Sequence, residues 1–270
     1  MRGVICGDII GSPYERGGTK DYDFELFIPK CKVTDDTIMT CAIAEAVMDT
    51  YEEAGLRDWD FLAWRSSVRM KEFGRRHMDF SYGGTFRKWL EGKVEDGYGS
   101  YGNGSAMRVS PVSWAYDELD DILDAAKATA LPTHGSPEGI RGAQAIASAV
   151  FLARMEENDE TIQQYIEEKF YYDYRTPLDA LRENYSFDVT CQGSVPVALR
   201  AYHEATGFED AMRLSVSMGG DSDTIAAMAG SIAEIRWEIP EKIWNRCEKL
   251  LPDDVAKTLS RWEEFVDGIC

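Results

Sequence analysis

The chain has 270 residues, of which 44% are hydrophobic and 29% charged, so it can enclose a large core in one or two domains. A net charge of −19 argues against general affinity for nucleic-acid phosphates or anionic membranes. The six cysteines are scattered without paired spacing, no secretion signal is recognisable and the apolar runs are too short to span a bilayer. These features favour free thiols in the cytoplasm.

The N-terminal stretch predicts a tightly packed helix. Gly3, Gly7 and Gly11 recur at a spacing of four residues, which places them on one smooth helix face that lets another backbone lie close. Pro13 is expected to end this helix. Glu15 then lies in the loop beyond, from which it can project into a cleft.

The stretch Thr34-Asp35-Asp36-Thr37 precedes an apolar run that begins at Ile38, and this order is typical of a helix start. Thr34 can cap the helix, and both carboxylates then lie in its first turn, where the helix dipole favours negative charge. From Ile38 we expect a helix of roughly fifteen residues. Taken alone, this stretch needs no function beyond starting a helix.

Two glycine-containing turns follow in the middle of the chain. The backbone N–H groups of the Gly102-Asn103-Gly104-Ser105 turn could bind an anion. Ser136 is placed to cap a helix whose first residue is Pro137, and His134 just ahead could reach a ligand at that helix start. An ordinary turn and a hydrogen-bonded loop histidine are the simpler alternatives. Residues 156–190 are acidic and aromatic and predict amphipathic surface helices without catalytic residues.

A second acidic site, Gly219-Gly220-Asp221-Ser222-Asp223-Thr224, opens another helix rich in small residues. Asp-Thr-Ile occurs at 36–38 and again at 223–225, so each site brings two carboxylates to a helix start. Four converging buried carboxylates would repel one another unless cations neutralise them. Oxygen ligands suit a hard ion such as Mg²⁺ or Mn²⁺, so the pattern predicts a divalent, two-metal site.

No stretch shows sustained strand alternation, and no linker divides the chain, which predicts an all-α protein with a single domain over residues 1–270. Five motifs occur in register and together resemble the ADP-ribosylglycohydrolases, the group that includes the dinitrogenase-reductase-activating glycohydrolase. These motifs are Gly7-Asp8 with Glu15, Thr34-Asp35-Asp36-Thr37, Gly102–Arg108, Thr133-His134 with Pro137-Glu138-Gly139, and Gly219–Thr224. The resemblance runs from residue 3 to about Pro240.

The resemblance implies a compact orthogonal helical bundle with two Mg²⁺ or Mn²⁺ ions at the bottom of a cleft. The protein ligands it implies are Thr34, Asp35, Asp36, Asp221, Asp223 and Thr224. The residues it implies for the ADP-ribose pocket are Asn103, Gly104, Ser105, His134, Gly135, Gly219 and Gly220. Glu15 matches a loop glutamate that touches the metal site, and Asp8 is expected to be structural.

The predicted activity is hydrolysis of the bond between ADP-ribose and a modified acceptor. Cleavage at the anomeric carbon builds positive charge on the ribose, and a dinuclear site can activate water and fix the ribose hydroxyls. Glu15, Asp35 or Asp36 could move the proton, but their spacing does not decide which one does. An arginine-linked protein is the default substrate. A dinuclear phosphohydrolase of free nucleotides and a catalytically silent ADP-ribose-binding relative remain as alternatives.

Overall fold

The computed structural model describes residues 1–55 and 57–269 and is all-α, as predicted. Within these residues the extended chain contributes a single isolated bridge, between Gly102 and Thr190. The first helices are α1 (Arg2–Gly11), α2 (Asp35–Glu53), α3 (Trp59–Arg76), α4 (Gly84–Leu90), α5 (Gly104–Met107), α6 (Val112–Ala115), α7 (Leu119–His134) and α8 (Pro137–Arg154). The others are α9 (Asp159–Phe170), α10 (Leu178–Arg182), α11 (Cys191–Glu204), α12 (Phe208–Val216), α13 (Ser222–Arg236), α14 (Glu241–Cys247), a 3₁₀ turn (Glu248–Leu250) and α15 (Asp253–Ile269).

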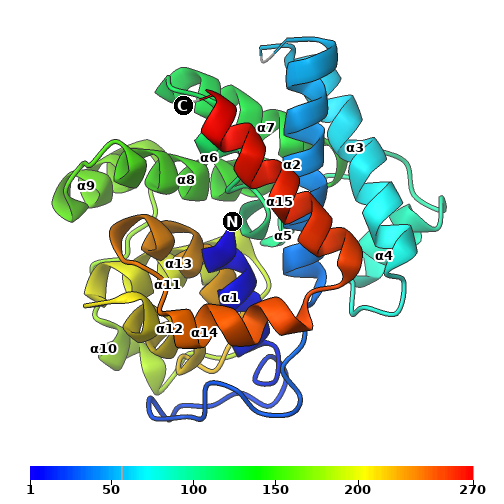
Figure 1. Cartoon of the computed structure of the whole chain (residues 1–270). Helices are drawn as coiled ribbons and strands as arrows, with labels where there is room; N and C mark the ends of the chain where they lie inside the picture. Colours follow the sequence, from blue (N-terminus) through cyan, green and yellow to red (C-terminus); the bar gives the residue numbers. More distant parts are fainter. Residues whose placement is uncertain (56, 270) are drawn as a thin grey trace.

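Helix α1 lies directly against α13 near the middle of the molecule (Figure 1). A Cβ atom added at Gly3 would lie 2.1 Å from the Gly230 carbonyl oxygen, and one at Gly7 would lie 2.2 Å from that of Ala226. At Gly11 it would meet the Cα of Asp223 at 2.4 Å. The predicted smooth face is therefore confirmed, and its partner is the helix that follows the second acidic site.

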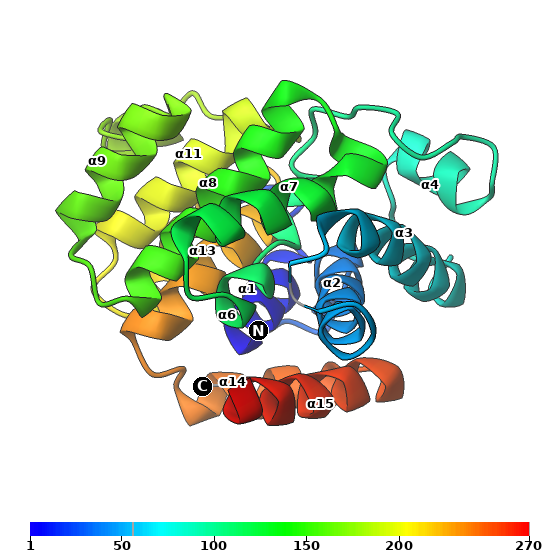
Figure 2. The same cartoon turned by 90° about the horizontal axis from the view of Figure 1, so that it is seen from above.

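Helix α2 begins directly after Thr34, where the sequence predicts, and ends at Glu53, which agrees with the length expected from Ile38. The Thr34 side chain caps it by accepting from the Asp36 backbone N–H. Helices α3 and α15 flank α2 (Figures 1 and 2). Glu45, in the middle of α2, accepts from the Thr258 hydroxyl at 2.8 Å and from the Arg261 guanidinium at 2.5 Å, so the C-terminal helix fixes α2 in place.

Residues 156–190 differ in part from the prediction of surface helices. Helices α9 and α10 account for two stretches, while residues 171–177 and 183–190 are extended or turn. Backbone hydrogen bonds from Asn103 N to the Val189 oxygen (2.8 Å) and from Cys191 N to the Tyr101 oxygen (3.1 Å) hold the later segment against the Gly102–Gly104 loop. Pairing with a distant segment overrides the local helical pattern there.

Five cysteines within the described residues are buried free thiols, whereas Cys270, where we expected the terminal helix to end, lies outside them. Among the helices of the described residues, none is long and apolar enough to cross a lipid bilayer.

Candidate active site

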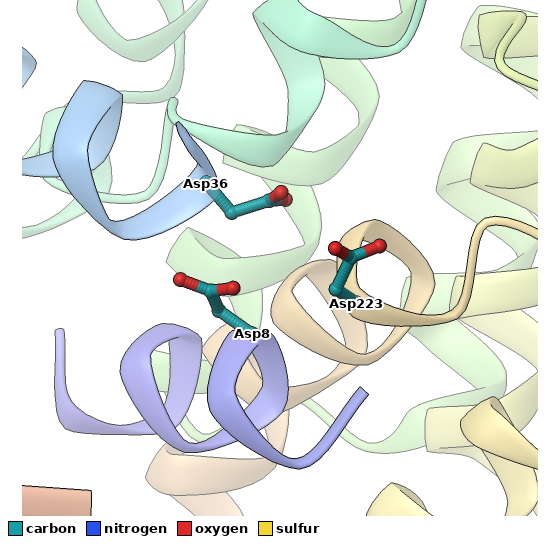
Figure 3. Close-up of side chains that lie close together, drawn as sticks. All are labelled: Asp8, Asp36 and Asp223. Atoms are coloured by element: carbon teal, nitrogen blue, oxygen red, sulfur yellow. The ribbon is translucent and has the colours of Figure 1, made fainter. Parts of the chain in front are cut away.

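The two acidic motifs meet at the starts of α2 and α13. The Thr224 hydroxyl donates a hydrogen bond to Asp36 Oδ2 at 3.2 Å, which joins the motifs directly. Asp36, Asp223 and Asp8 point toward one another from three helices (Figure 3), and one carboxylate oxygen from each lies within 4.8 Å of the others. The sequence brings these groups together through α1, since its glycine face positions α13 beside Asp8.

Asp8 was not among the predicted ligands, and its contacts show a positioning function. Its carboxylate accepts from the Thr34 N–H (3.0 Å) and hydroxyl (2.7 Å) and from the Thr37 N–H (3.1 Å) and hydroxyl. These four bonds fix the first turn of α2, and with it the orientation of Asp35 and Asp36. The Gly7-Asp8 pair in a helix of small residues was the sequence signal for this function.

The electrostatics of the acidic cluster favour a bound cation. Burial raises the pKa of Asp35 to about 8 and that of Asp221 to about 6, and it raises the pKa values of Asp36 and Asp223 well above the ordinary range. Neighbouring carboxylates add repulsion in every case. Asp36 Oδ1 is buried and has no hydrogen-bond partner among the described residues. A hard divalent ion fits this oxygen-only set and would compensate its charge.

A pocket of about 460 Å³ opens above the acidic cluster. The predicted residues that line it are Glu15, Asp35, Asp36, Asn103, Gly104, His134, Asp221, Asp223 and Thr224. Asn103 connects the glycine loop to the acidic cluster, because its side-chain amide donates to Asp221 Oδ2 at 2.7 Å and to Ser194 Oγ at 3.1 Å. Glu15 stands at the pocket edge with its carboxylate 3.9 Å from Arg16 Nε.

The other predicted residues have structural contacts. Thr34 donates to Asp8, and the Ser105 hydroxyl donates to the Gly139 carbonyl at 2.7 Å. Gly219 has a φ of +66°, which favours glycine, and a Cβ at Gly220 would lie 2.4 Å from the Tyr185 ring. At Gly135 a Cβ would lie 3.3 Å from the Leu131 carbonyl oxygen. These contacts explain the residue types without a ligand, and ligand contact at these positions stays a prediction.

Further parts of the pocket wall come from two segments that carry none of the five motifs. Residues 81–86 around the start of α4 form one part, and Phe187 and Val189 form another. The second pair lies in the acidic middle segment, where we expected no functional residue. Neither segment carries a catalytic pattern, and the position of Phe187 and Val189 depends on the tertiary pairing of residues 183–190 with the glycine loop.

Arg108, in the motif that begins with Gly102, is a buried cation in the pocket wall. Its Nη2 atom donates to the Thr133 hydroxyl at 2.8 Å, and that hydroxyl lies 2.8 Å from His134 Nδ1. Burial lowers the pKa of Arg108 to about 10. Burial and the nearby guanidinium lower the pKa of His134 well below its ordinary value, so the imidazole is neutral.

Comparison with known proteins agrees with this geometry. Residues 1–267 match the sequence profile of the ADP-ribosylglycohydrolases. The chain belongs to this family. It is 26% identical to human ADP-ribosylhydrolase ARH3, over 97% of this chain and 92% of that protein, and 28% identical to mouse ARH3, over 97% and 90%.

Other similar proteins extend this comparison. ADP-ribosylarginine hydrolase Tri1 of Pseudomonas putida is 25% identical over 86% of this chain and 68% of its own length. A solved structure described as an ADP-ribosylglycohydrolase-related protein complex superposes with a TM-score of 0.68 at 25% identity, covering 96% of this chain and 95% of that one. This ADP-ribosylglycohydrolase is thus a hydrolase of ADP-ribose conjugates, with an acidic cluster able to hold a metal ion.

Proposed function

We propose that this ADP-ribosylglycohydrolase is metal-dependent and holds two Mg²⁺ or Mn²⁺ ions in the acidic cluster at the pocket bottom. The observation that carries the proposal is the convergence of three buried carboxylates, Asp36, Asp221 and Asp223, and the half-buried Asp35 on a pocket with room for a ligand. The residues that would hold the ions are Thr34, Asp35, Asp36, Asp221, Asp223 and Thr224. Bound there, divalent ions supply charge neutralisation and lower the pKa of water.

The chain's own residues have separate tasks in this proposal. Asp8 and Asn103 orient the acidic groups through their hydrogen bonds to the α2 start and to Asp221. Glu15 stands at the edge of the pocket, where a carboxylate can hold or move a proton at the ribose or at the leaving group. The glycine loop and His134 form the wall that takes the ADP-ribose.

For the acceptor we propose an arginine-linked protein. Glu15, which is not among the proposed ligands, gives the pocket edge a carboxylate, and this suits a cationic guanidinium beside the scissile bond. A net charge of −19 disfavours nucleic acid and anionic membranes, so we expect neither as a partner. We assign the protein to the cytoplasm because the five cysteines of the described residues are buried free thiols.

A panel of defined conjugates tests the proposal. Arginine-, serine- and nucleic-acid-linked ADP-ribose are each offered with Mg²⁺, with Mn²⁺ and with a chelator, and release of free ADP-ribose is followed. We expect release from the arginine-linked conjugate with metal and none with chelator. Equal release under chelation would end the metal proposal, and preference for another conjugate would end the arginine proposal. Phosphate release from a free nucleotide would favour the phosphohydrolase alternative.

A further inference from the structure

Arg108 is a buried cation whose charge the protein only partly satisfies. Its side chain is 1% exposed and lines the pocket. Nη2 donates to the Thr133 hydroxyl at 2.8 Å and to the Thr129 carbonyl oxygen at 3.4 Å, whereas Nε and Nη1 have no hydrogen-bond partner within residues 1–55 and 57–269. A buried guanidinium with unpaired N–H donors lowers the stability of the folded protein unless a ligand supplies negative charge. Its placement at the pocket wall therefore indicates an anionic ligand group on this side.

Thr133 links this cation to His134. A guanidinium can only donate, so the Thr133 oxygen accepts from Arg108, and its single hydroxyl proton remains to be donated. His134 Nδ1 lies 2.8 Å away and can accept that proton. A neutral ring whose Nδ1 accepts carries its own proton on Nε2. The competing arrangement places the proton on Nδ1 and lets Thr133 donate to the neighbouring Tyr98 hydroxyl.

The Nε2 atom lies against the glycine loop at the pocket. A Cβ added at Gly104 would come within 2.9 Å of this nitrogen, and one at Gly102 within 3.7 Å. Larger side chains would therefore cover it, whereas glycine leaves it open toward the ligand. With the proton on Nε2, the ring presents a donor on the same side as the unsatisfied Arg108 guanidinium.

We propose that Arg108 is a positioning residue that acts through Thr133 to hold His134 in the Nε2–H form, so that the ring donates to the diphosphate of ADP-ribose. The inference rests on the proposed function for the identity of the ligand. The positive charge of the Arg108 guanidinium attracts the diphosphate. The relay from Arg108 through Thr133 to His134 directs the Nε2–H of His134 toward it as a hydrogen-bond donor.

The first test reads the tautomer without any substrate. The chain has three histidines, so long-range ¹H–¹⁵N NMR spectra of the imidazoles are simple, and His134→Gln assigns the signal. We expect the Nε2–H pattern in the wild type and in Thr133→Ser, which keeps the hydroxyl. Thr133→Val, which removes the hydroxyl at nearly constant volume, should lose this preference. An Nδ1–H pattern in the wild type would overturn the inference.

The second test is a double-mutant cycle on the dissociation constant of ADP-ribose, measured calorimetrically on the Mg²⁺-loaded protein. Thr133→Val should weaken binding roughly tenfold, the size expected for one hydrogen bond to a charged group, and Thr133→Ser should restore it. A glutamine amide has no tautomer, so in the His134→Gln background Thr133→Val should change binding by less than about twofold.

The outcomes separate this inference from the proposed function. A Thr133→Val effect of equal size in both backgrounds would show that Thr133 is merely structural and would overturn the relay. If the wild type binds ADP-ribose and shows the Nε2–H form but cleaves no conjugate, the inference stands and the proposed reaction fails.

Discussion

Thr224 and Asp36 lie 188 positions apart, yet the Thr224 hydroxyl donates to the Asp36 carboxylate at 3.2 Å. This contact joins the first turns of α2 and α13. Asp36 belongs to the first Asp-Thr-Ile repeat and Thr224 to the second. It shows that each acidic motif, besides starting its own helix, contacts the other motif.

Replacing Asp223 with Asn should abolish metal-dependent turnover while preserving the fold. The amide has nearly the same shape but removes one of the mutually repelling charges, so we also expect a higher melting temperature without metal. Mg²⁺ should then give little thermal shift. Asp179→Asn, whose carboxylate is 93% exposed, serves as the matched control. Turnover at the wild-type rate in Asp223→Asn would rule out a catalytic metal at this residue.

Asp8→Asn should lower both stability and turnover, although Asp8 is not among the proposed ligands. An amide cannot accept all four bonds from Thr34 and Thr37, and its NH₂ group would face donors. We expect a loss of about 2 kcal/mol in unfolding free energy and roughly a ten- to hundredfold loss of activity. Chemical denaturation and steady-state kinetics measure the two effects. Unchanged kinetics would show that α2 keeps its orientation without Asp8.

The acidic cluster should make the metal-free protein less stable as the pH rises. An acid whose folded-state pKa lies above its unfolded value of about 3.9 binds its proton more tightly when folded, so this stability is present below about pH 4. It is lost as the pH passes through about 6 for Asp221 and about 8 for Asp35. With chelator, the melting temperature should fall by roughly 5 °C or more over this range. Mg²⁺ should raise it more at high pH than at low pH, and Asp221→Asn should flatten the profile.

Glu15→Gln should lower kcat while leaving the fold and ADP-ribose binding nearly unchanged. The change removes a proton-transferring group at the pocket edge but keeps its size, so we expect a fall of roughly a hundredfold. Glu25→Gln, in the exposed part of the same loop, is the matched control. If Glu15→Gln and Glu25→Gln have equal rates, Glu15 takes no part in proton transfer.

Gly7→Ala tests whether α1 positions the site. The new Cβ would lie 2.2 Å from the Ala226 carbonyl oxygen, so α1 and α13 must separate, at a cost of about 3 kcal/mol. Asp8 and Asp223 would move apart with them, and Mg²⁺ affinity should fall. Gly268→Ala, where no atom lies within 4 Å of the new Cβ, is the control and should leave stability within about 1 kcal/mol of the wild type.

The sequence predicts this fold and the pocket floor well because the relevant signals are local. A cap at Thr34, glycines at spacing four and an acidic pair before an apolar run each follow from helix chemistry within a few residues. Residues 183–190 lacked such a signal, since their position depends on backbone pairing with Tyr101 and Asn103. A structural role for Asp8 was expected, but its four hydrogen bonds to the start of α2 could not be predicted from one buried carboxylate.

The contact between α1 and α13, made by backbone atoms, has a consequence for how this enzyme could diversify. Any side chain added at Gly3 or Gly7 would force the two helices apart, so the helices that carry Asp8 and Asp223 have almost no freedom to change their spacing. Another part of the pocket wall, residues 81–86 with Phe187 and Val189, consists of the start of α4 and of chain outside the helices. We therefore expect the pocket lining to vary more readily at these segments than at the helix starts that carry the acidic cluster.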